Sequence, residues 1–298
     1  MPSYRRLEEH LIDLFNSTNR VIWKNKEYTD ISAYKPKVQN GGGECKTDIY
    51  VALRASDKED YIKITVKKSD AEFLANKMTV VDAEAVLGDD WEPIVLDAIN
   101  SLEQAFKNSI VIYAKPNSNP KDLYFTLGWK LEITNKVRTL SSRINLPKSE
   151  IVDKIYRGTD QPDRRRDAIV ANIVIKNSGV ADYLLEGDIS DFLDAQSVLD
   201  RLINLESYTP SPVYLAFTAN NYRLIADKAD GKRTLAVAIK WSLSNDKLVP
   251  EFIFNQPLVY QGETHMMPLI KEALSRLGIT TATTNLELLK DIDIDSLS

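Results

Sequence analysis

The chain opens with apolar residues at helical spacing. Leu7, Leu11, Leu14 and Phe15 recur at positions i, i+4, i+7 and i+8. Residues spaced in this way share one face of an α-helix. The pattern therefore predicts an amphipathic helix over residues 4–17, with one face against a core.

Two strand-like runs follow the helix. Residues 47–53 and 61–67 are rich in apolar and β-branched side chains, and the charged segment 56–60 joins them. Two such runs with a short polar connection predict a β-hairpin.

The rest of the chain alternates predicted strands and helices without a repeat. A helix over 71–78 can be capped by Ser69 or Asp70. Further helices are predicted at 97–107, 191–205 and 266–277, strands at 110–114, 168–175, 213–218, 235–241 and 249–254, and a loop at Pro116–Pro120. This order predicts an α/β (α+β) protein with a second α/β half.

A cluster of Pro and Gly between residues 145 and 165 marks a candidate boundary. It divides the chain into residues 1–150, expected to hold the core, and residues 151–298, expected to recognise a ligand or to form a dimer. No long flexible linker marks the boundary, so two halves of one compact body are an equal alternative to two domains.

Composition narrows the class of protein. The 298 residues are 43% hydrophobic and 27% charged, as in ordinary globular proteins. No apolar run reaches the roughly 18 residues of a membrane helix, so we expect no membrane association and a cytoplasmic location. One cysteine and two histidines exclude an internal disulfide and a zinc site rich in cysteine or histidine. The net charge of −5 confines any nucleic-acid contact to a local basic surface.

The polar residues of the predicted hairpin gather at one end. Alternate side chains of a strand share a face, so Lys63, Thr65 and Lys67 lie together on the second strand. Asp48, preceded by three glycines at 41–43, stands at the start of the first strand. In an antiparallel pair the start of one strand lies beside the end of the other, which places Asp48 near Thr65 and Lys67.

This layout suits the hydrolysis of phosphodiesters. Mg²⁺ prefers oxygen ligands, and a bound metal polarises a phosphate and activates an attacking water. Asp48 would hold the metal and Lys67 would offset charge developing on the phosphate oxygens. Lys68 is the alternative lysine, but its parity places it on the other face. The plain alternative is a surface pair of strand-end residues, worth about 0–1 kcal/mol.

The pattern resembles the PD-(D/E)XK nuclease superfamily, which includes most type II restriction endonucleases. In that family an Asp opens one strand, an acid-X-Lys tripeptide lies on the next, and a helix follows. Thr47-Asp48 and Thr65-Val66-Lys67 match the first two elements, and the segment Ser69 to Met78 matches the helix. The resemblance covers roughly residues 4–115, with motifs in 41–78. It implies a restriction-endonuclease-like mixed β-sheet core flanked by helices, with residues 1–150 as nuclease core and residues 151–298 as a DNA-recognition or dimerisation module. Mg²⁺ would be the cofactor and double-stranded DNA the substrate.

The match departs from the family at Thr65, which stands where a second acid is expected. Some restriction enzymes of the family carry Asn or Gln there, so a neutral oxygen can suffice. The missing carboxylate can come from Glu44, or from Glu8 or Glu9, since the family's first helix often supplies an acid. The metal ligands and catalytic residues implied are therefore Asp48, Thr65 and Lys67, completed by one of these glutamates.

Polar segments elsewhere are candidate DNA contacts, because Arg, Lys and Asn bind phosphates and base edges. Their ordinary alternatives are a solvated charged face, an ion-pair network and turn chemistry. The candidates are Lys136, Arg138 and Arg143 in a basic segment, Arg164, Arg165 and Arg166 in a polar loop, and Asn221, Arg223, Lys232 and Arg233 in two later loops.

The sequence thus favours a Mg²⁺-dependent DNA endonuclease, most simply a sequence-specific type II restriction enzyme. A cutter of both strands often needs two active sites, and a homodimer is the simple way to supply them. The alternatives are a phage or mobile-element nuclease of looser specificity, a non-catalytic DNA-binding protein on a decayed nuclease fold, and a plain interaction module.

Overall fold

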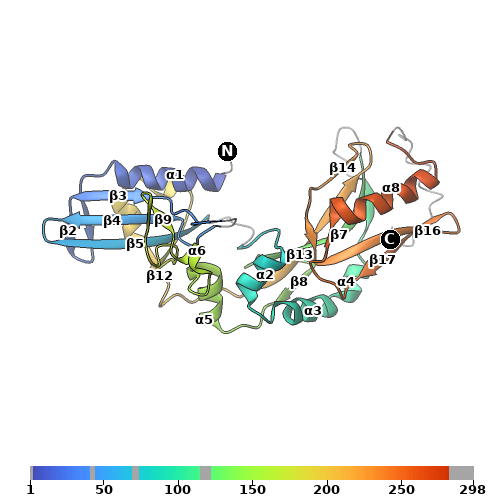
Figure 1. Ribbon diagram of the computed structural model, residues 1–298, viewed down its shortest axis with the longest axis horizontal. Helices are drawn as coiled ribbons and strands as arrows, with labels where there is room; N and C mark the ends of the chain where they lie inside the picture. The colour runs from blue at the N-terminus through green and yellow to red at the C-terminus, as the bar shows by residue number, and fades with distance from the viewer. Residues whose placement is uncertain (1–2, 41–43, 69–73, 115–121, 282–298) are drawn as a thin grey trace. The chain divides into compact units, whose positions relative to one another are not determined.

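The chain folds into helices and β-sheets, which confirms the predicted α+β class (Figure 1). Among the helices of the described residues, none is long and apolar enough to cross a membrane. The computed structural model describes residues 3–40, 44–68, 74–114 and 122–281.

The chain forms two compact units, each built from two separate stretches. Unit 1 comprises Met1–Glu72 and Asn145–Ser211, and unit 2 comprises Phe73–Ile144 and Pro212–Ser298. The sequence-based division at residue 150 does not coincide with these units. The reason is a long-range strand pairing, described below, that joins the stretch after Asn145 to the N-terminal sheet.

Unit 1 carries the predicted hairpin. Its helical elements are α1 (Ser3–Asn16), α5 (Lys148–Ile151), the π-helix η1 (Val152–Arg157), α6 (Asp163–Arg166), the 3₁₀-helix η2 (Ile189–Asp191) and α7 (Ala195–Asp200). Its strands are β1 (Val21–Trp23), β2 (Lys26–Tyr28), β3 (Asp30–Tyr34), β4 (Ile49–Ala55), β5 (Lys58–Lys67), β9 (Ile169–Val170), β10 (Ile173–Val174), β11 (Tyr183–Glu186) and β12 (Ile203–Asn204).

The main sheet of unit 1 has five strands in the order β12-β11-β5-β4-β3. Strands β3, β4 and β5 are antiparallel neighbours, as expected for a hairpin. Strand β11 pairs with β5 in parallel, which makes the sheet mixed as predicted. Parallel neighbours need a long connection, and here the whole first stretch of unit 2 lies between β5 and β11 in the chain.

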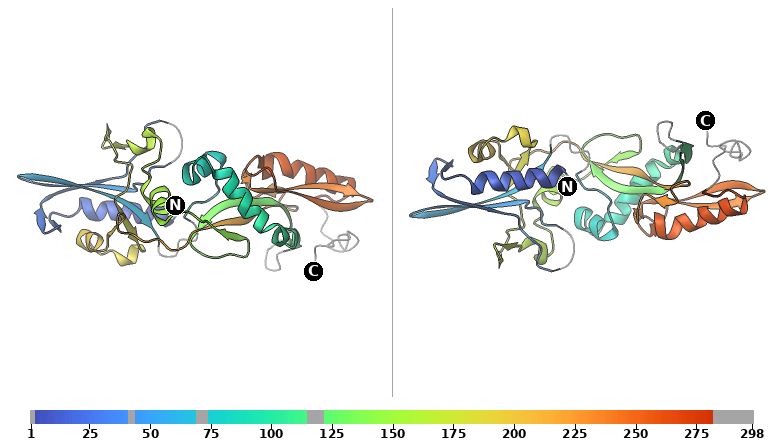
Figure 2. Two further views of the ribbon diagram at one scale, coloured as in Figure 1. Left: turned by 90° about the horizontal axis from the view of Figure 1, so that it is seen from below. Right: turned by 90° about the horizontal axis from the view of Figure 1, so that it is seen from above.

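The two faces of this sheet are covered differently. Helices α1 and α7 lie on one face, and the β9–β10 hairpin lies on the other (Figure 2). The predicted apolar face of α1 is buried, with Leu11 and Phe15 against strand residues such as Val51. On the opposite face Val170 packs on Tyr50. The core therefore sits between α1, α7 and the apolar face of the β4–β5 hairpin.

Unit 2 is built around a seven-stranded sheet with helices on both sides (Figure 1). Its helices are α2 (Val80–Leu87), α3 (Trp91–Ser101), α4 (Glu103–Lys107), the π-helix η3 (Gly262–Met266) and α8 (Met267–Arg276). Its strands are β6 (Ile112–Ala114), β7 (Leu123–Thr134), β8 (Ser141–Arg143), β13 (Tyr214–Arg223), β14 (Lys228–Ala229), β15 (Thr234–Leu235), β16 (Val237–Ser244), β17 (Lys247–Ile253) and β18 (Tyr260–Gln261).

Aromatic side chains fill the core of unit 2. Phe106 of α4 lies 5.0 Å from Trp129 and 5.3 Å from Phe217, measured between ring centroids. Edge-to-face pairs of this kind add to the burial of apolar area. Strands β7 and β13 thus pack against the short helix α4.

Three predicted elements were wrong in the described residues. The helix predicted over 71–78 is absent from 74–78, because Ala75 forms a bridge with Ile133 and Lys77 has a positive φ of 60°. Thr79 instead caps α2 through a capping box with Asp82. The remainder of that helix and of its cap, residues 69–73, lies outside the described residues, as does the Pro116–Pro120 loop.

The other two wrong elements belong to unit 1. The strand predicted over 168–175 is the β9–β10 hairpin, turned by Ala171 and Asn172 at positive φ of 48° and 69°. Such a two-residue turn with positive φ reverses the chain. The helix predicted over 191–205 shortens to α7, because residues 203–204 pair with β11 as a strand.

Candidate functional site

The structure brings Asp48 and the end of β5 together, at the position expected from strand parity. Asp48 donates its backbone N–H to the carbonyl oxygen of Ile64 at 2.8 Å. Its carboxylate Oδ2 accepts from the Val66 N–H at 2.7 Å and from the Thr65 hydroxyl at 3.3 Å. Thr65, only 1% exposed, therefore positions the carboxylate of Asp48.

The side chains of Lys67 and Lys68 have different neighbours, as expected for successive residues of a strand. Lys67 is a charge neighbour of Asp48 and lowers the pKa of that carboxyl. Lys68 forms an ion pair with Asp188 at 3.1 Å. Within the described part of the chain, Lys67 has no ion-pair partner within 4.0 Å. Lys67 is thus the lysine available to a ligand at Asp48.

Asp48 lines a hollow of about 280 Å³ within unit 1. Glu44 and the lysines Lys35 and Lys37 line the same hollow. Cys45 lies there too, but burial raises the pKa of its thiol to about 11. A thiol reacts through its thiolate, so Cys45 is not a nucleophile at neutral pH. The three glycines before Glu44 lie outside the described residues.

The three candidate glutamates take different positions. Glu44 is exposed and lines the hollow with Asp48. Glu8 is 8% exposed, forms an ion pair with Lys35, and has its pKa raised chiefly by burial and also by the charge of Asp48. Glu9 pairs with Arg5 at 3.1 Å on the exposed side of α1. The structure therefore places Glu44 and Glu8 near Asp48, and Glu9 elsewhere.

The surroundings of the Asp48 carboxyl group disfavour its charged form, and a bound cation would offset that effect. Burial raises its pKa above the ordinary value of 3.8, and Glu44 adds to the increase. The charge of Lys67 and the hydrogen bond from Val66 act in the opposite direction. A desolvated carboxylate beside a second carboxylate is stabilised by a bound cation.

The donor atoms of the site are carboxylate oxygens, the type of ligand that hard divalent cations prefer. One oxygen of Asp48 has no hydrogen-bond partner among the residues that the structure describes, and Glu44 lies in the same hollow. In the described ranges, no group of three or more His, Cys, Asp and Glu side chains is close enough to hold a metal. Mg²⁺ is commonly held by only one or two carboxylates, with water and substrate phosphates completing its shell. Asp48 and Glu44 fit that minimal set.

The sequence reasoning missed two residues beside the site. Lys46 is half-buried, and the charges of Lys67 and Asp48 act on it. Glu186 at the end of β11 pairs in parallel register with Lys67, so both side chains emerge on the same face of the sheet. Lys46 could have been found from its place beside Asp48 in the sequence. Glu186 gives no such signal, because only the tertiary pairing of β11 brings it to β5.

The predicted arginine run belongs to the same unit as Asp48. Arg164 is exposed, and Arg165 is 8% exposed. Arg166 forms an ion pair with Asp163 and lies 3.9 Å from Asp167. This supports the ion-pair alternative for Arg166 and leaves Arg164 as the accessible member of the run. The run forms α6 rather than a loop.

The other candidate DNA contacts lie in unit 2. Asn221 is buried, accepts from the Thr126 hydroxyl at 3.2 Å and donates to Asp230 at 3.1 Å. Arg223 lies 3.7 Å from the same Asp230. The loop prediction for this pair was wrong, since both belong to β13. The remaining unit 2 candidates are half-buried Arg138 and Arg233 and exposed Lys136, Arg143 and Lys232.

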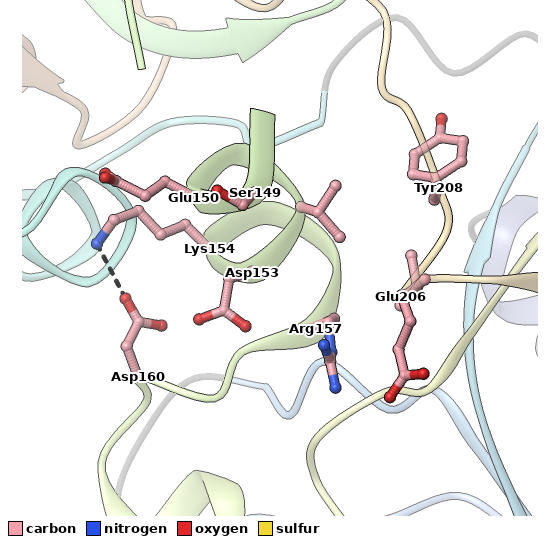
Figure 3. Close-up of a pocket in the computed structure, with 10 residues that line it drawn as sticks. Ser149, Glu150, Asp153, Lys154, Arg157, Asp160, Glu206 and Tyr208 are labelled. Carbon is pink, nitrogen blue, oxygen red and sulfur yellow. Dashed lines mark hydrogen bonds and ion pairs between the residues drawn. The ribbon is translucent and has the colours of Figure 1, made fainter. Parts of the chain in front are cut away.

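A second hollow of about 630 Å³ lies in unit 1 beside the helix formed by α5 and η1 (Figure 3). Acidic and basic side chains line it together, and Lys154 pairs with Asp160 at 3.0 Å. Asp160 is also a charge neighbour of Lys46.

Comparison of the chain with protein-family models, curated proteins and solved structures found no match.

Proposed function

We propose that this chain is a metal-dependent DNA endonuclease that hydrolyses phosphodiester bonds at the Asp48 site. One observation carries the proposal. The desolvated carboxylate of Asp48, at the start of β4, is held by hydrogen bonds from Val66 and Thr65. Its charge neighbour Lys67, at the end of β5, has no ion-pair partner among the described residues. The resemblance to the PD-(D/E)XK superfamily implies the same roles for Asp48 and Lys67.

The surroundings suit a polyanionic substrate. Lys35 and Lys37 line the hollow with Asp48, and Lys46 and Lys67 are charge neighbours of its carboxylate. Lysines bind phosphates as point charges, and focused positive charge in a hollow raises the local concentration of an anionic substrate. The net charge of −5 therefore does not oppose binding of DNA at this place.

Mg²⁺ is the cofactor that the donor set favours. Asp48 and Glu44 would hold it, and Thr65 would orient Asp48. When bound, the metal would polarise the phosphate and lower the pKa of an attacking water. Lys67 would place a positive charge where negative charge develops on the phosphate oxygens. A sequence-specific restriction enzyme acting as a homodimer on double-stranded DNA is the form we favour, because two-fold symmetry supplies two active sites.

The test is cleavage of supercoiled plasmid with Mg²⁺ and with EDTA. We expect cutting only with Mg²⁺, and loss of cutting by at least about a hundredfold in Lys67→Ala, since one electrostatic contact to a transition state contributes about that much. Lys68→Ala is the matched control and should keep wild-type cutting, because Lys68 faces Asp188. Equal loss in both lysine variants would remove Lys67 from the site.

The products separate the nuclease alternatives. Discrete fragments support a restriction enzyme, and a smear supports the phage or mobile-element nuclease of looser specificity. A specific observation favours the remaining candidate, a non-catalytic DNA-binding protein. Thr65 stands where the family carries an acid, and among the described residues no three metal-binding side chains cluster. Wild-type protein that binds duplex DNA and does not cut it with Mg²⁺ or Mn²⁺ would establish that alternative.

A further inference from the structure

Lys46 is held in place by two other segments of unit 1, one at Gly179 and one at Gly158. Its backbone N–H and that of Thr47 both donate to the carbonyl oxygen of Gly179, at 3.1 and 3.0 Å. The side-chain stem passes over Gly158, where an added Cβ would lie 2.5 Å from Cγ of Lys46. Gly158 has φ of +79° and ends η1. The path of this lysine is therefore built into the fold, unlike that of a surface lysine.

The ammonium group of Lys46 ends among other charges. Lys67, Asp48, Asp160 and Arg165 all act on it. Burial, followed by the charge of Lys67, lowers its pKa to about 8. None of the carboxylates in the described ranges lies within 4.0 Å of the group.

The two carboxylates whose charges act on Lys46 also have other partners. Asp160 pairs with Lys154 at 3.0 Å, and Oδ2 of Asp48 accepts from Val66 and Thr65. Two half-buried lysines, Lys46 and Lys67, are thus charge neighbours, and within the described residues neither has a carboxylate within 4.0 Å. Like charges in partly desolvated surroundings repel, and an anion between them would remove the repulsion.

We propose that Lys46 is a phosphate-binding residue that holds a backbone phosphate of the nucleic-acid strand entering the Asp48 site. The assignment rests on the proposed function for the identity of the ligand. A phosphodiester fits because it is a compact anion and a lysine binds it as a point charge. The two lysines then have different roles. Lys46 binds the strand, and Lys67 acts at the phosphate beside Asp48.

The test measures binding separately from cutting. Wild type, Lys46→Met and Lys26→Gln are titrated with a 20-base-pair duplex in EDTA at several salt concentrations. Lys46→Met keeps the stem beside Gly158 and removes the charge. Lys26→Gln is the control, since Lys26 is an exposed lysine of β2 in the same unit.

Loss of one phosphate contact should reduce the slope of log K against log salt by about 1. It should also weaken binding about eightfold at 0.1 M salt, as the slope per contact requires. Lys46→Arg should restore both. A slope and affinity of Lys46→Met equal to those of Lys26→Gln would overturn the assignment.

Two further measurements distinguish phosphate binding by Lys46 from a purely structural role, and separate its test from the test of the nuclease proposal. If Lys46 only balances charge, Lys46→Met will melt below wild type, whereas relief of repulsion from Lys67 predicts an equal or higher melting temperature. Wild type that binds but does not cut overturns the nuclease proposal and leaves the Lys46 result standing. Wild type that does not bind the duplex at any salt overturns both.

Discussion

Replacing the Asp48 carboxylate should lower the free energy of unfolding only when the side-chain oxygen that accepts hydrogen bonds is lost as well. Oδ2 accepts from the Val66 N–H at 2.7 Å and from the hydroxyl of Thr65, which is 1% exposed. Asp48→Ala leaves these donors without that acceptor, and an unsatisfied buried donor costs about 1–3 kcal/mol. Asp48→Asn keeps a side-chain oxygen for Val66. We therefore expect Asp48→Ala to unfold about 1–3 kcal/mol more easily than Asp48→Asn.

The pH dependence of Asp48→Asn has a defined sign. Burial raises the pKa of Asp48 in the folded state above its ordinary value of 3.8. The folded state then binds the proton more tightly than the unfolded chain, so the wild type loses stability as the pH rises through the folded pKa. At pH 7 the neutral Asn should make the protein at least as stable as wild type, and this advantage should vanish as the pH falls below 3.8.

Urea unfolding followed by circular dichroism, in EDTA, measures these differences, and amide hydrogen exchange of Val66 reports the bond itself. The amide of Val66 should exchange faster in Asp48→Ala than in Asp48→Asn. Equal unfolding free energies and equal exchange rates in the two variants would refute the acceptor role of Asp48. Both variants should lose cutting, since neither keeps the carboxylate.

Two other predictions test the site and the fold. Glu44→Gln should weaken Mg²⁺-dependent cutting and raise the Mg²⁺ concentration that cutting requires. Glu9→Gln should do neither, because Glu9 pairs with Arg5 away from the hollow. If the cutting rates of the two variants depend equally on Mg²⁺ concentration, Glu44 is not a metal ligand. Gly128→Ala should prevent folding of unit 2 or cost well over the roughly 1 kcal/mol expected for Gly278→Ala. The added Cβ at Gly128 meets the carbonyl oxygen of Val237 at 2.2 Å, whereas nothing lies within 4 Å at Gly278; thermal melts compare the two, and equal melting temperatures would contradict the packing argument.

Local periodicity predicted the hairpin and the grouping of its polar side chains. The alternation in β4 and β5 decided which residues share a face, so Asp48, Thr65 and Lys67 could be grouped before the fold was known. The same reasoning separated Lys67 from Lys68, which the structure pairs with Asp188. It was less successful where short apolar runs allowed two structures, as in residues 168–175, because two residues at positive φ turned one predicted strand into a hairpin.

Local pattern could not reveal the contacts made at long range. The parallel pairing of β11 with β5 spans the first stretch of unit 2, and it brings Glu186 beside Lys67. The passage of Lys46 over Gly158 also depends on residues far apart in the chain. These contacts form because burial of apolar area selects among compact arrangements, a choice that no short window of sequence encodes.

By itself, the sequence determined the face on which the acid and the lysine emerge, since strand periodicity is a local property of the backbone. Only the tertiary structure decided which acids stand near Asp48, that Thr65 holds it in place, and that the charge of Lys67 acts on Lys46. Those outcomes depend on packing between α1, the hairpin and the stretch after Asn145, where distance in space and not in sequence sets the electrostatics.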